Sequence, residues 1–88
     1  MSETFSVDVR ITPREGILDP QGETISRALG NLGYEGIASV RAGRLVRIEI
    51  EAATADDARG EVERMCEELV ANPTIEDYVV QVRETATR

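Results

Sequence analysis

The sequence has no lysine, no histidine and no tryptophan among its 88 residues, and it has one cysteine. Without histidine it lacks the usual general base near neutral pH and the commonest metal ligand. Without lysine it can form no Schiff base. Cys66 has no histidine to activate it, which excludes a nucleophilic cysteine–histidine pair. Carboxylate chemistry or oxygen-ligated Mg²⁺ or Ca²⁺ remains, so the composition favours a protein that acts by contact.

Long hydrophobic runs and an excess of positive charge are also missing. No apolar run approaches the roughly 20 residues that span a bilayer, and residues 1–4 lack the basic and apolar regions of a signal peptide. The net charge of −7 disfavours binding to nucleic acid or to an anionic membrane. A lone cysteine offers no intramolecular disulfide. We therefore expect a cytoplasmic protein with no nucleic acid partner and no membrane partner.

The chain has the composition of one small globular domain. Hydrophobic residues make up 41% and charged residues 31%, which is ordinary for a folded protein. A domain of this size buries only about 60–65% of its unfolded surface. We therefore expect two packed layers in a single domain over residues 1–88, ending in a polar tail at 84–88.

The first part of the chain predicts a strand and then a helix. Over residues 4–12, every second residue is apolar: Phe5, Val7, Val9 and Ile11. This alternation is typical of a strand with one buried face. Asp19-Pro20 predicts a helix start, because aspartate caps helices and proline fits the first helical position; Gly33 predicts its end. Gly22 is unusual in a first turn, and it indicates close approach of another backbone or of a ligand.

Residues 37–53 have an extended pattern. Apolar residues of one parity recur through this segment: Val40, Ala42, Val46, Ile48 and Ile50. Ala42-Gly43-Arg44 interrupts the pattern, and we interpret it as a tight hairpin turn between two strands. A single long strand bent at Gly43 is the alternative.

The last part predicts a second helix and a final strand. Thr54 and Asp57 stand three residues apart, as at a capped helix start. The helix that follows has one apolar stripe: Ala58, Val62, Met65, Cys66, Leu69 and Val70. Asn72-Pro73 ends this helix, because proline disfavours a helical conformation in the residue before it. The last strand is expected over residues 75–82.

The expected element order is therefore βαββαβ. Because each helix is apolar on one side, both helices are expected to lie on the same face of a four-stranded antiparallel sheet. The predicted fold class is α+β, a ferredoxin-like two-layer sandwich. Its other sheet face and its sheet edges are bare, which favours dimerisation or docking.

One carboxylate pair is a candidate for catalysis. Glu49 and Glu51 lie on one face of a predicted strand, about 7 Å apart, a spacing that suits work on a sugar or the binding of a metal. A solvated face beside Arg41 and Arg47 explains the pair better. Cys66 is best explained as a packing residue within the apolar stripe.

Four sequence blocks have no such generic explanation. They are Leu18-Asp19-Pro20-Gln21-Gly22, Val40-Arg41-Ala42-Gly43-Arg44, Met65-Cys66-Glu67, and residues 69–78, which include Asn72-Pro73 and Ile75-Glu76-Asp77-Tyr78. In this order and at these spacings they closely resemble the PurS family, the small subunit of phosphoribosylformylglycinamidine synthase. The resemblance covers residues 7–82. Arg14 and Arg44 stand where family members often carry lysine, so the positive charge is kept.

The resemblance implies a non-catalytic role in purine biosynthesis. The family's enzyme converts formylglycinamide ribonucleotide, ATP and glutamine into formylglycinamidine ribonucleotide, ADP, phosphate and glutamate. A PurQ-like glutaminase subunit frees ammonia, and a large PurL-like synthetase subunit uses it with ATP and magnesium. The resemblance implies that this chain bridges the two, supports ammonia transfer, and has no catalytic residue, cofactor or metal of its own.

The resemblance also implies self-association as a homodimer or a tetramer. We expect an interface with a partner or a second copy at eight residues: Asp19, Pro20, Gln21, Gly22, Arg44, Asn72, Pro73 and Tyr78. The alternative is a stand-alone regulatory module of ferredoxin-like fold that binds a metabolite between subunits. That alternative predicts saturable ligand binding by the isolated protein.

Overall fold

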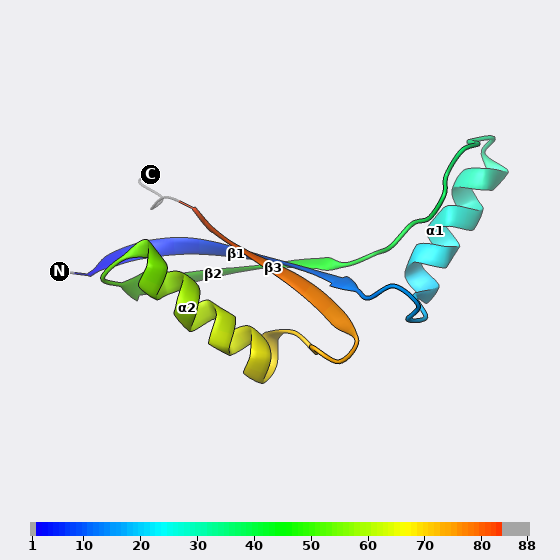
Figure 1. Ribbon diagram of the computed structural model, residues 1–88. Helices are drawn as coiled ribbons and strands as arrows, with labels where there is room; N and C mark the ends of the chain where they lie inside the picture. The colour runs from blue at the N-terminus through cyan, green and yellow to red at the C-terminus, as the bar shows by residue number, and fades with distance from the viewer. Residues whose placement is uncertain (1, 84–88) are drawn as a thin grey trace.

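The computed structural model describes residues 2–83, and Figure 1 shows the path of the chain. The elements in chain order are β1 (Glu3–Pro13), α1 (Pro20–Asn31), β2 (Arg44–Ala52), α2 (Ala55–Met65), the π-helical turn η1 (Cys66–Val70) and β3 (Glu76–Arg83). No helix among the described residues is long and apolar enough to cross a membrane. The expected polar tail at 84–88 lies outside the described residues.

The strands form one antiparallel sheet in the order β2-β1-β3. Val9, in the middle of β1, pairs with Val46 of β2 on one side and with Val80 of β3 on the other. β1 is therefore central, and within residues 2–83 β2 and β3 each keep one edge without a strand partner. The α+β class is confirmed. The four-stranded ferredoxin-like sheet is not, because residues 37–42, expected as the fourth strand, pair with no strand of the described chain.

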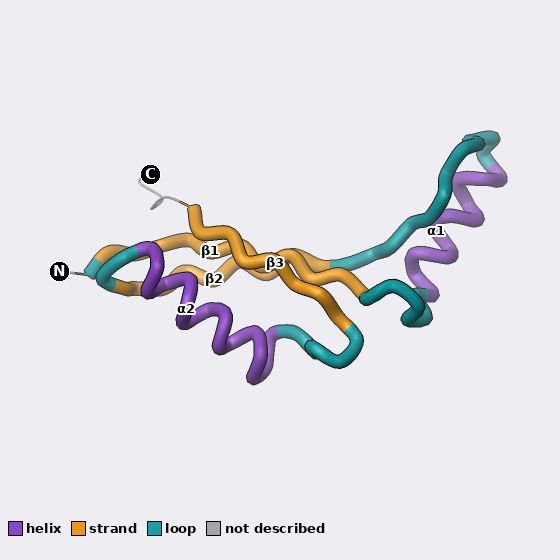
Figure 2. Tube along the Cα trace, viewed as in Figure 1, coloured by secondary structure: helices purple, strands orange, loops and turns teal. Residues whose placement is uncertain are grey.

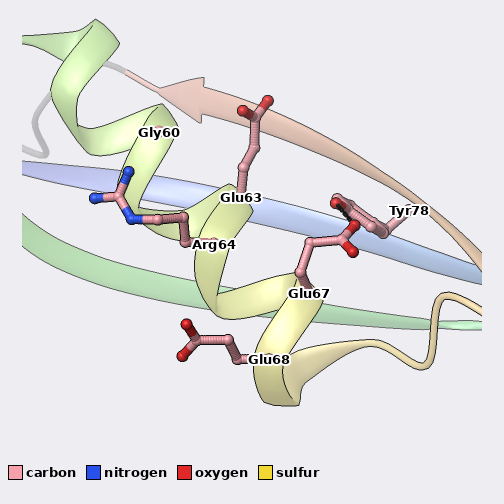
Figure 3. Close-up of a pocket in the computed structure, with 6 residues that line it drawn as sticks. All are labelled: Gly60, Glu63, Arg64, Glu67, Glu68 and Tyr78. Atoms are coloured by element: carbon pink, nitrogen blue, oxygen red, sulfur yellow. Dashed lines mark hydrogen bonds between the residues drawn. The ribbon is translucent and has the colours of Figure 1, made fainter.

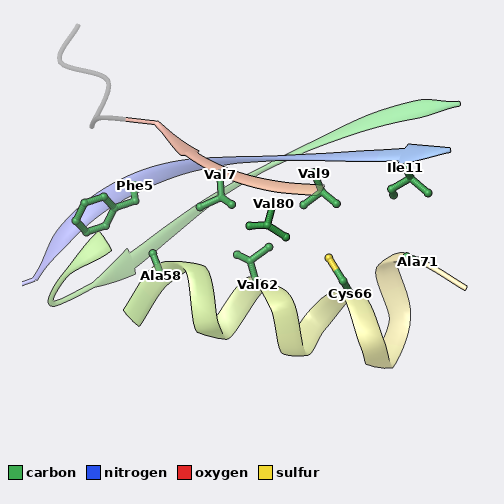
Figure 4. Packing of buried hydrophobic residues seen from close by; sticks show 9 residues of the cluster. All are labelled: Phe5, Val7, Val9, Ile11, Ala58, Val62, Cys66, Ala71 and Val80. Carbon is green, nitrogen blue, oxygen red and sulfur yellow. The ribbon is translucent and has the colours of Figure 1, made fainter. Parts of the chain in front are cut away.

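The core lies between the sheet and α2 (Figure 4). The alternation predicted for β1 is confirmed, since its apolar side chains are all buried: Phe5, Val7, Val9 and Ile11. Ala58, Val62 and Cys66 face them at 0% exposure. Thr54 caps α2 as predicted, because its Oγ1 accepts a hydrogen bond from the Asp57 N–H at 3.1 Å. One apolar helix stripe packed on one apolar sheet face thus makes the whole core.

The opposite face of the sheet is polar, with an ion-paired carboxylate at its centre. Asp8 is only 9% exposed. Arg47 donates hydrogen bonds to both of its carboxylate oxygens, at 2.7 and 3.2 Å, and Arg83 lies 3.6 Å away. The hydrogen bond from Arg47 is the largest cause that lowers the pKa of Asp8. Two guanidinium groups therefore cover and neutralise a charge that burial alone would disfavour.

The π-helical turn η1 changes which residues of the second helix face the core. The Ala71 N–H donates to the Cys66 carbonyl, five residues earlier, at 3.1 Å. This turn is one residue wider than an α-helical turn, so the side chains within it and after it are rotated relative to an α-helix. Leu69 is 86% exposed and Ala71 is only 7% exposed. The prediction that Leu69 belongs to the apolar stripe is therefore wrong.

Residues 14–43, which we call the arm, leave the sheet after β1, form α1 and return to β2 (Figures 1 and 2). The caps of α1 are as predicted: Asp19 accepts from the Gly22 N–H, and Gly33 has a φ of 100°. The prediction that α1 covers the sheet beside α2 is wrong, because Figure 1 shows α1 standing apart from both. Caps and periodicity determine a helix locally, but they do not determine the surface on which it packs.

Gly43 does not form a hairpin turn; it lies where the chain passes close to the end of β1. Residues 37–43 run on into β2 without reversing direction (Figure 2), and Gly43 is not among the glycines with positive φ that such turns need. The hairpin prediction is therefore wrong. The alternative of a single long strand bent at Gly43 fits the direction of the chain, but β2 begins only at Arg44. A Cβ at Gly43 would clash with the Ile11 carbonyl oxygen and lie 2.9 Å from Thr12 Cγ2.

Candidate interface at the root of the arm

Asp19 connects the outgoing and returning parts of the arm. Its Oδ1 accepts a hydrogen bond from the Gly22 N–H at 3.1 Å, which caps α1. Its Oδ2 accepts a second bond from the Ala42 N–H at 2.9 Å. Hydrogen bonds to a charged acceptor are stronger than neutral ones. One carboxylate thus fixes the start of α1 to the segment that leads into β2, at the end of the arm that adjoins the sheet, which we call the root of the arm.

Gly22 lies where the returning segment crosses the start of α1. A Cβ on Gly22 would lie 2.5 Å from the Val40 carbonyl oxygen and would clash with the Asp19 carboxylate. Glycine is therefore required here by space. The expected close approach of another backbone is confirmed, and that backbone belongs to the same chain.

Arg44 and Glu76 form a second cluster at the root of the arm. Arg44 donates to both carboxylate oxygens of Glu76, at 2.7 and 3.3 Å, and to the Val70 carbonyl at 2.9 Å. Glu76 also accepts from the Asn72 N–H at 2.8 Å. The bond from Arg44, followed by that from Asn72, lowers the pKa of Glu76. The cluster holds the connection between η1 and β3 against the start of β2.

Three of the four sequence blocks meet here. Ala42, which is held by Asp19, and Arg44, which is held by Glu76, are two residues apart in one extended segment. Arg14 adds a further link at the start of the arm, because its Nε donates to the Glu76 carbonyl at 3.4 Å and lies 3.4 Å from Asp77 Oδ1. These three blocks thus share one place in space, where the arm joins the sheet.

The eight predicted interface residues fall into two groups. Four have hydrogen bonds or close contacts within the root of the arm: Asp19, Gly22, Arg44 and Asn72. The others are Pro20 and Gln21, which are exposed, and Pro73 and Tyr78, which are half-buried. The first group shapes the root of the arm. The second leaves side-chain surface that a partner can contact, and that contact stays a prediction.

Sequence reasoning missed Glu76 as a site residue and misinterpreted Gly43. Glu76 shares the strand parity of Tyr78, Val80 and Val82, which face the core side. An acidic residue on the apolar parity of a strand needs a cationic partner, and that signal points to Arg44. For Gly43 the sequence offers no signal that separates a turn from a close backbone contact.

Tyr78 lies at the edge of an acidic groove that runs along the surface of the second helix (Figure 3). The groove has a volume of 450 Å³ and is lined by Gly60, Glu63, Arg64, Glu67, Glu68 and Tyr78. The Tyr78 hydroxyl donates to Glu67 Oε2 at 2.5 Å. No group of three histidine, cysteine or acidic side chains among residues 2–83 is arranged to hold a metal. With three glutamates and one arginine, the groove suits contact with a basic group.

The Tyr78 phenol is expected to titrate far above its ordinary pKa of 10. Its hydrogen bond to Glu67 is the largest cause that raises its pKa to about 12. Because folding raises this pKa, the bond stabilises the protein fully below pH 10, and the contribution is lost as the pH rises from 10 to about 12. Phenolate absorbance of the Tyr34→Phe variant measures Tyr78 alone. Adding Glu67→Gln should move the midpoint down towards 10; an unchanged midpoint would show that Glu67 is not the cause.

The remaining candidates lie on the surface or in the core. Glu49 and Glu51 are exposed on the open sheet face, opposite Ser6 and Thr4, which agrees with a solvated surface. Cys66 is buried, and burial is the largest cause that raises the pKa of its thiol. A buried thiol with a raised pKa is a weak nucleophile, so Cys66 acts as a packing residue.

The sequence matches a family model over residues 6–84, the PurS model, which is described as phosphoribosylformylglycinamidine (FGAM) synthase. The chain is 42% identical over 77 residues to the phosphoribosylformylglycinamidine synthase subunit PurS of Archaeoglobus fulgidus, covering 88% of this chain and 96% of the relative. It is 36% identical to the same subunit of Bacillus subtilis, over 96% of this chain and 99% of the relative.

Solved structures agree with the sequence comparison. The PurS subunit of Thermotoga maritima superposes with a TM-score of 0.84 at 32% identity, covering 94% of this chain and 95% of that one. A chain in the structure of PurLQS from Thermotoga maritima superposes with a TM-score of 0.82 at 32% identity, covering 92% and 99%. The resemblance seen in the four sequence blocks is confirmed, and the chain belongs to the PurS family of phosphoribosylformylglycinamidine synthase subunits.

Proposed function

We propose that this chain is the non-catalytic bridging subunit of a phosphoribosylformylglycinamidine synthase in de novo purine biosynthesis. The observation that carries the proposal is the close match, over 92% of this chain, to a chain of the PurLQS structure. The partners are then a PurL-like synthetase and a PurQ-like glutaminase. The subunit holds the two enzymes together so that ammonia from glutamine reaches the synthetase.

The surface of the chain supports a role by contact. The arm projects from the sheet and exposes large apolar side chains: Ile17, Leu18, Ile25, Leu32, Tyr34 and Ile37. Contiguous exposed apolar surface marks interaction sites in soluble proteins. Histidine, the commonest general base near neutral pH, and lysine, which Schiff-base catalysis needs, do not occur in the sequence.

The remaining parts of the proposal follow from this role. The subunit needs no cofactor, because ATP and magnesium act in the synthetase, and it works in the cytoplasm with its partners. It forms a homodimer or a tetramer. Pro20, Gln21, Pro73 and Tyr78 present the contact surface near the root of the arm, while Asp19, Gly22, Arg44 and Asn72 hold that surface in place.

Reconstitution of the complete reaction tests the bridging role. The PurL-like and PurQ-like proteins of the same organism are combined with formylglycinamide ribonucleotide, glutamine, ATP and magnesium, with and without this chain. Formation of formylglycinamidine ribonucleotide from glutamine is expected only with the chain present. Formation from added ammonium is expected to need the synthetase but not a glutaminase.

Two results would contradict the proposal. One is glutamine-dependent synthesis at full rate without this chain, and the other is synthesis by this chain alone. Binding of a small metabolite to the isolated chain, without an effect on the coupled reaction, would support the regulatory alternative.

A further inference from the structure

The sheet has an open face, which is the face that α2 does not cover. The core and α2 lie on the other face (Figure 4), and α1 stands apart from the sheet (Figure 1). Within residues 2–83, no helix therefore covers the open face. Antiparallel sheets commonly leave one face in water, so the charges and apolar side chains on this face decide whether it binds a partner.

Three arginines gather at the centre of the open face, on a chain whose net charge is −7. Arg47 and Arg83 lie 2.7 and 3.6 Å from the carboxylate of Asp8. Arg10 follows Asp8 by two residues in β1, so both lie on the same face. The hydrogen bond from Arg47 is the main cause that lowers the pKa of Asp8, and the charges of Arg83 and Arg10 add to it. These four residues, which we call the arginine cluster, keep an excess of positive charge.

The other acidic residues of the open face lie outside the arginine cluster. Glu49 and Glu51 pair with the first half of β1, beyond Asp8 as seen from Arg10. Asp77 lies at the opposite end of the face, where Arg14 is 3.4 Å away. Arg10 itself has no ion pair within residues 2–83. Its guanidinium group is therefore available to a carboxylate from outside the chain.

Arg10 lies between two exposed apolar side chains. Its neighbours in the strand register are Leu45 of β2 and Val79 of β3, and these are 55% and 61% exposed. The three side chains form one row across the sheet. Protein interfaces are enriched in arginine and apolar side chains at their centre, where other charged residues are depleted. A small anion gains nothing from apolar neighbours, so the row suits a protein segment better.

We propose that the arginine cluster is the docking surface for an acidic segment of one of the two partner enzymes. A carboxylate of that segment pairs with Arg10, and the side chains beside it pack on Leu45 and Val79. The rest of this acidic chain repels such a segment, which favours a single orientation. The inference rests on the proposed bridging function and deepens it, because a subunit that joins two enzymes needs two contact surfaces. The open face is on the other side of the sheet from Tyr78.

Charge reversal at Arg10 tests the docking surface. Arg10→Glu removes one positive charge and adds one negative charge, so the net charge changes from −7 to −9. Arg64→Glu makes the same change on α2, where the Arg64 side chain is 68% exposed, and is the matched control. Binding of the PurL-like and PurQ-like proteins to each variant is measured separately at one ionic strength. Arg10→Glu should weaken the binding of one enzyme by roughly tenfold or more, and Arg64→Glu should change it little.

Zero-length cross-linking identifies the occupant of the open face. The sequence has no lysine, so Arg10→Lys places the only side-chain amine of the chain on this face. A carbodiimide joins that amine to a carboxylate in contact with it, and mass spectrometry of the peptides identifies the linked residue. A link from position 10 to an aspartate or glutamate of one partner enzyme is expected. Arg64→Lys is the matched control, and position 64 should not link. A link from position 10 to a second copy of this chain instead of an enzyme would overturn the proposal.

The outcomes separate the docking surface from the bridging function. If the unsubstituted chain bound neither enzyme, both proposals would fail. If it bound them and Arg10→Glu bound as tightly as Arg64→Glu, only the docking surface would be overturned. Circular dichroism shows whether Arg10→Glu is folded. If it is not, the Arg10→Lys protein, which keeps the positive charge, decides by its cross-links, and their absence in the assembled complex would overturn the docking surface.

Discussion

Replacing Gly43 with alanine should lower the free energy of unfolding by about 1–3 kcal/mol and disturb the root of the arm. The added Cβ would clash with the Ile11 carbonyl oxygen and press on Thr12 Cγ2. A backbone atom cannot move aside as a flexible side chain can, so the end of β1 or the arm must shift. Urea unfolding at matched protein concentration measures the loss, because an oligomer's stability depends on concentration.

Gly30→Ala is the control for this substitution. Nothing lies within 4 Å of a Cβ at Gly30, and this glycine is inside α1. Alanine in a helix interior is more favourable than glycine by up to about 1 kcal/mol, so Gly30→Ala should be neutral or stabilising in the isolated chain. If Gly43→Ala were as well tolerated as Gly30→Ala, the close approach of β1 at Gly43 would be wrong.

Ile11→Ala is expected to remove about 2–5 kcal/mol of stability, which is a large fraction of the total for a small domain. Ile11 is 1% exposed, at the end of the core nearest the arm. Its truncation leaves a cavity between β1 and the region around Cys66 and Ala71 that this small core cannot refill. Thermal and urea unfolding followed by circular dichroism measure the effect.

Leu69→Ala removes an apolar side chain close by with the opposite expectation. Leu69 is 86% exposed within the π-helical turn, so its truncation should change the stability by no more than about 0.5 kcal/mol. A loss as large as that of Ile11→Ala would show that Leu69 faces the core and that the turn is α-helical. The pair thus tests the π-helical turn as well as the core.

The sequence predicts the local structure well. The alternation of β1, the caps at Asp19 and Thr54 and the end of the second helix at Asn72-Pro73 each depend on neighbours within a few residues, and all are found. The errors have two causes, one local and one at longer range. Leu69 follows a helical period that holds only without the wider turn of η1. The helical periodicity of α1 predicts that one of its sides is apolar. It does not predict which surface that side packs on, so α1 could be wrongly placed on the sheet.

At the candidate site, too, the sequence shows which residues are unusual but not which residues they contact. The blocks around Asp19 and Asn72 could be singled out because local structure does not require all of their residues. Their physical reason is tertiary: Asp19 reaches Ala42 over 23 positions, and Arg44 reaches Glu76 over 32. No spacing rule connects residues so far apart. The Gly22 contact was predicted, but only the fold identifies Val40 as its neighbour.

The position of β1 at the centre of the sheet has a consequence for biosynthesis on the ribosome. β1 is made first, but one of its two neighbours is β3, and Ser6 pairs with Arg83. Native pairing on that side cannot begin until nearly all of the described chain has been translated. The first strand therefore emerges early with apolar residues on one side and waits for both neighbours. Contacts of such long separation form slowly, so one side of β1 stays without its native partner until synthesis is nearly complete.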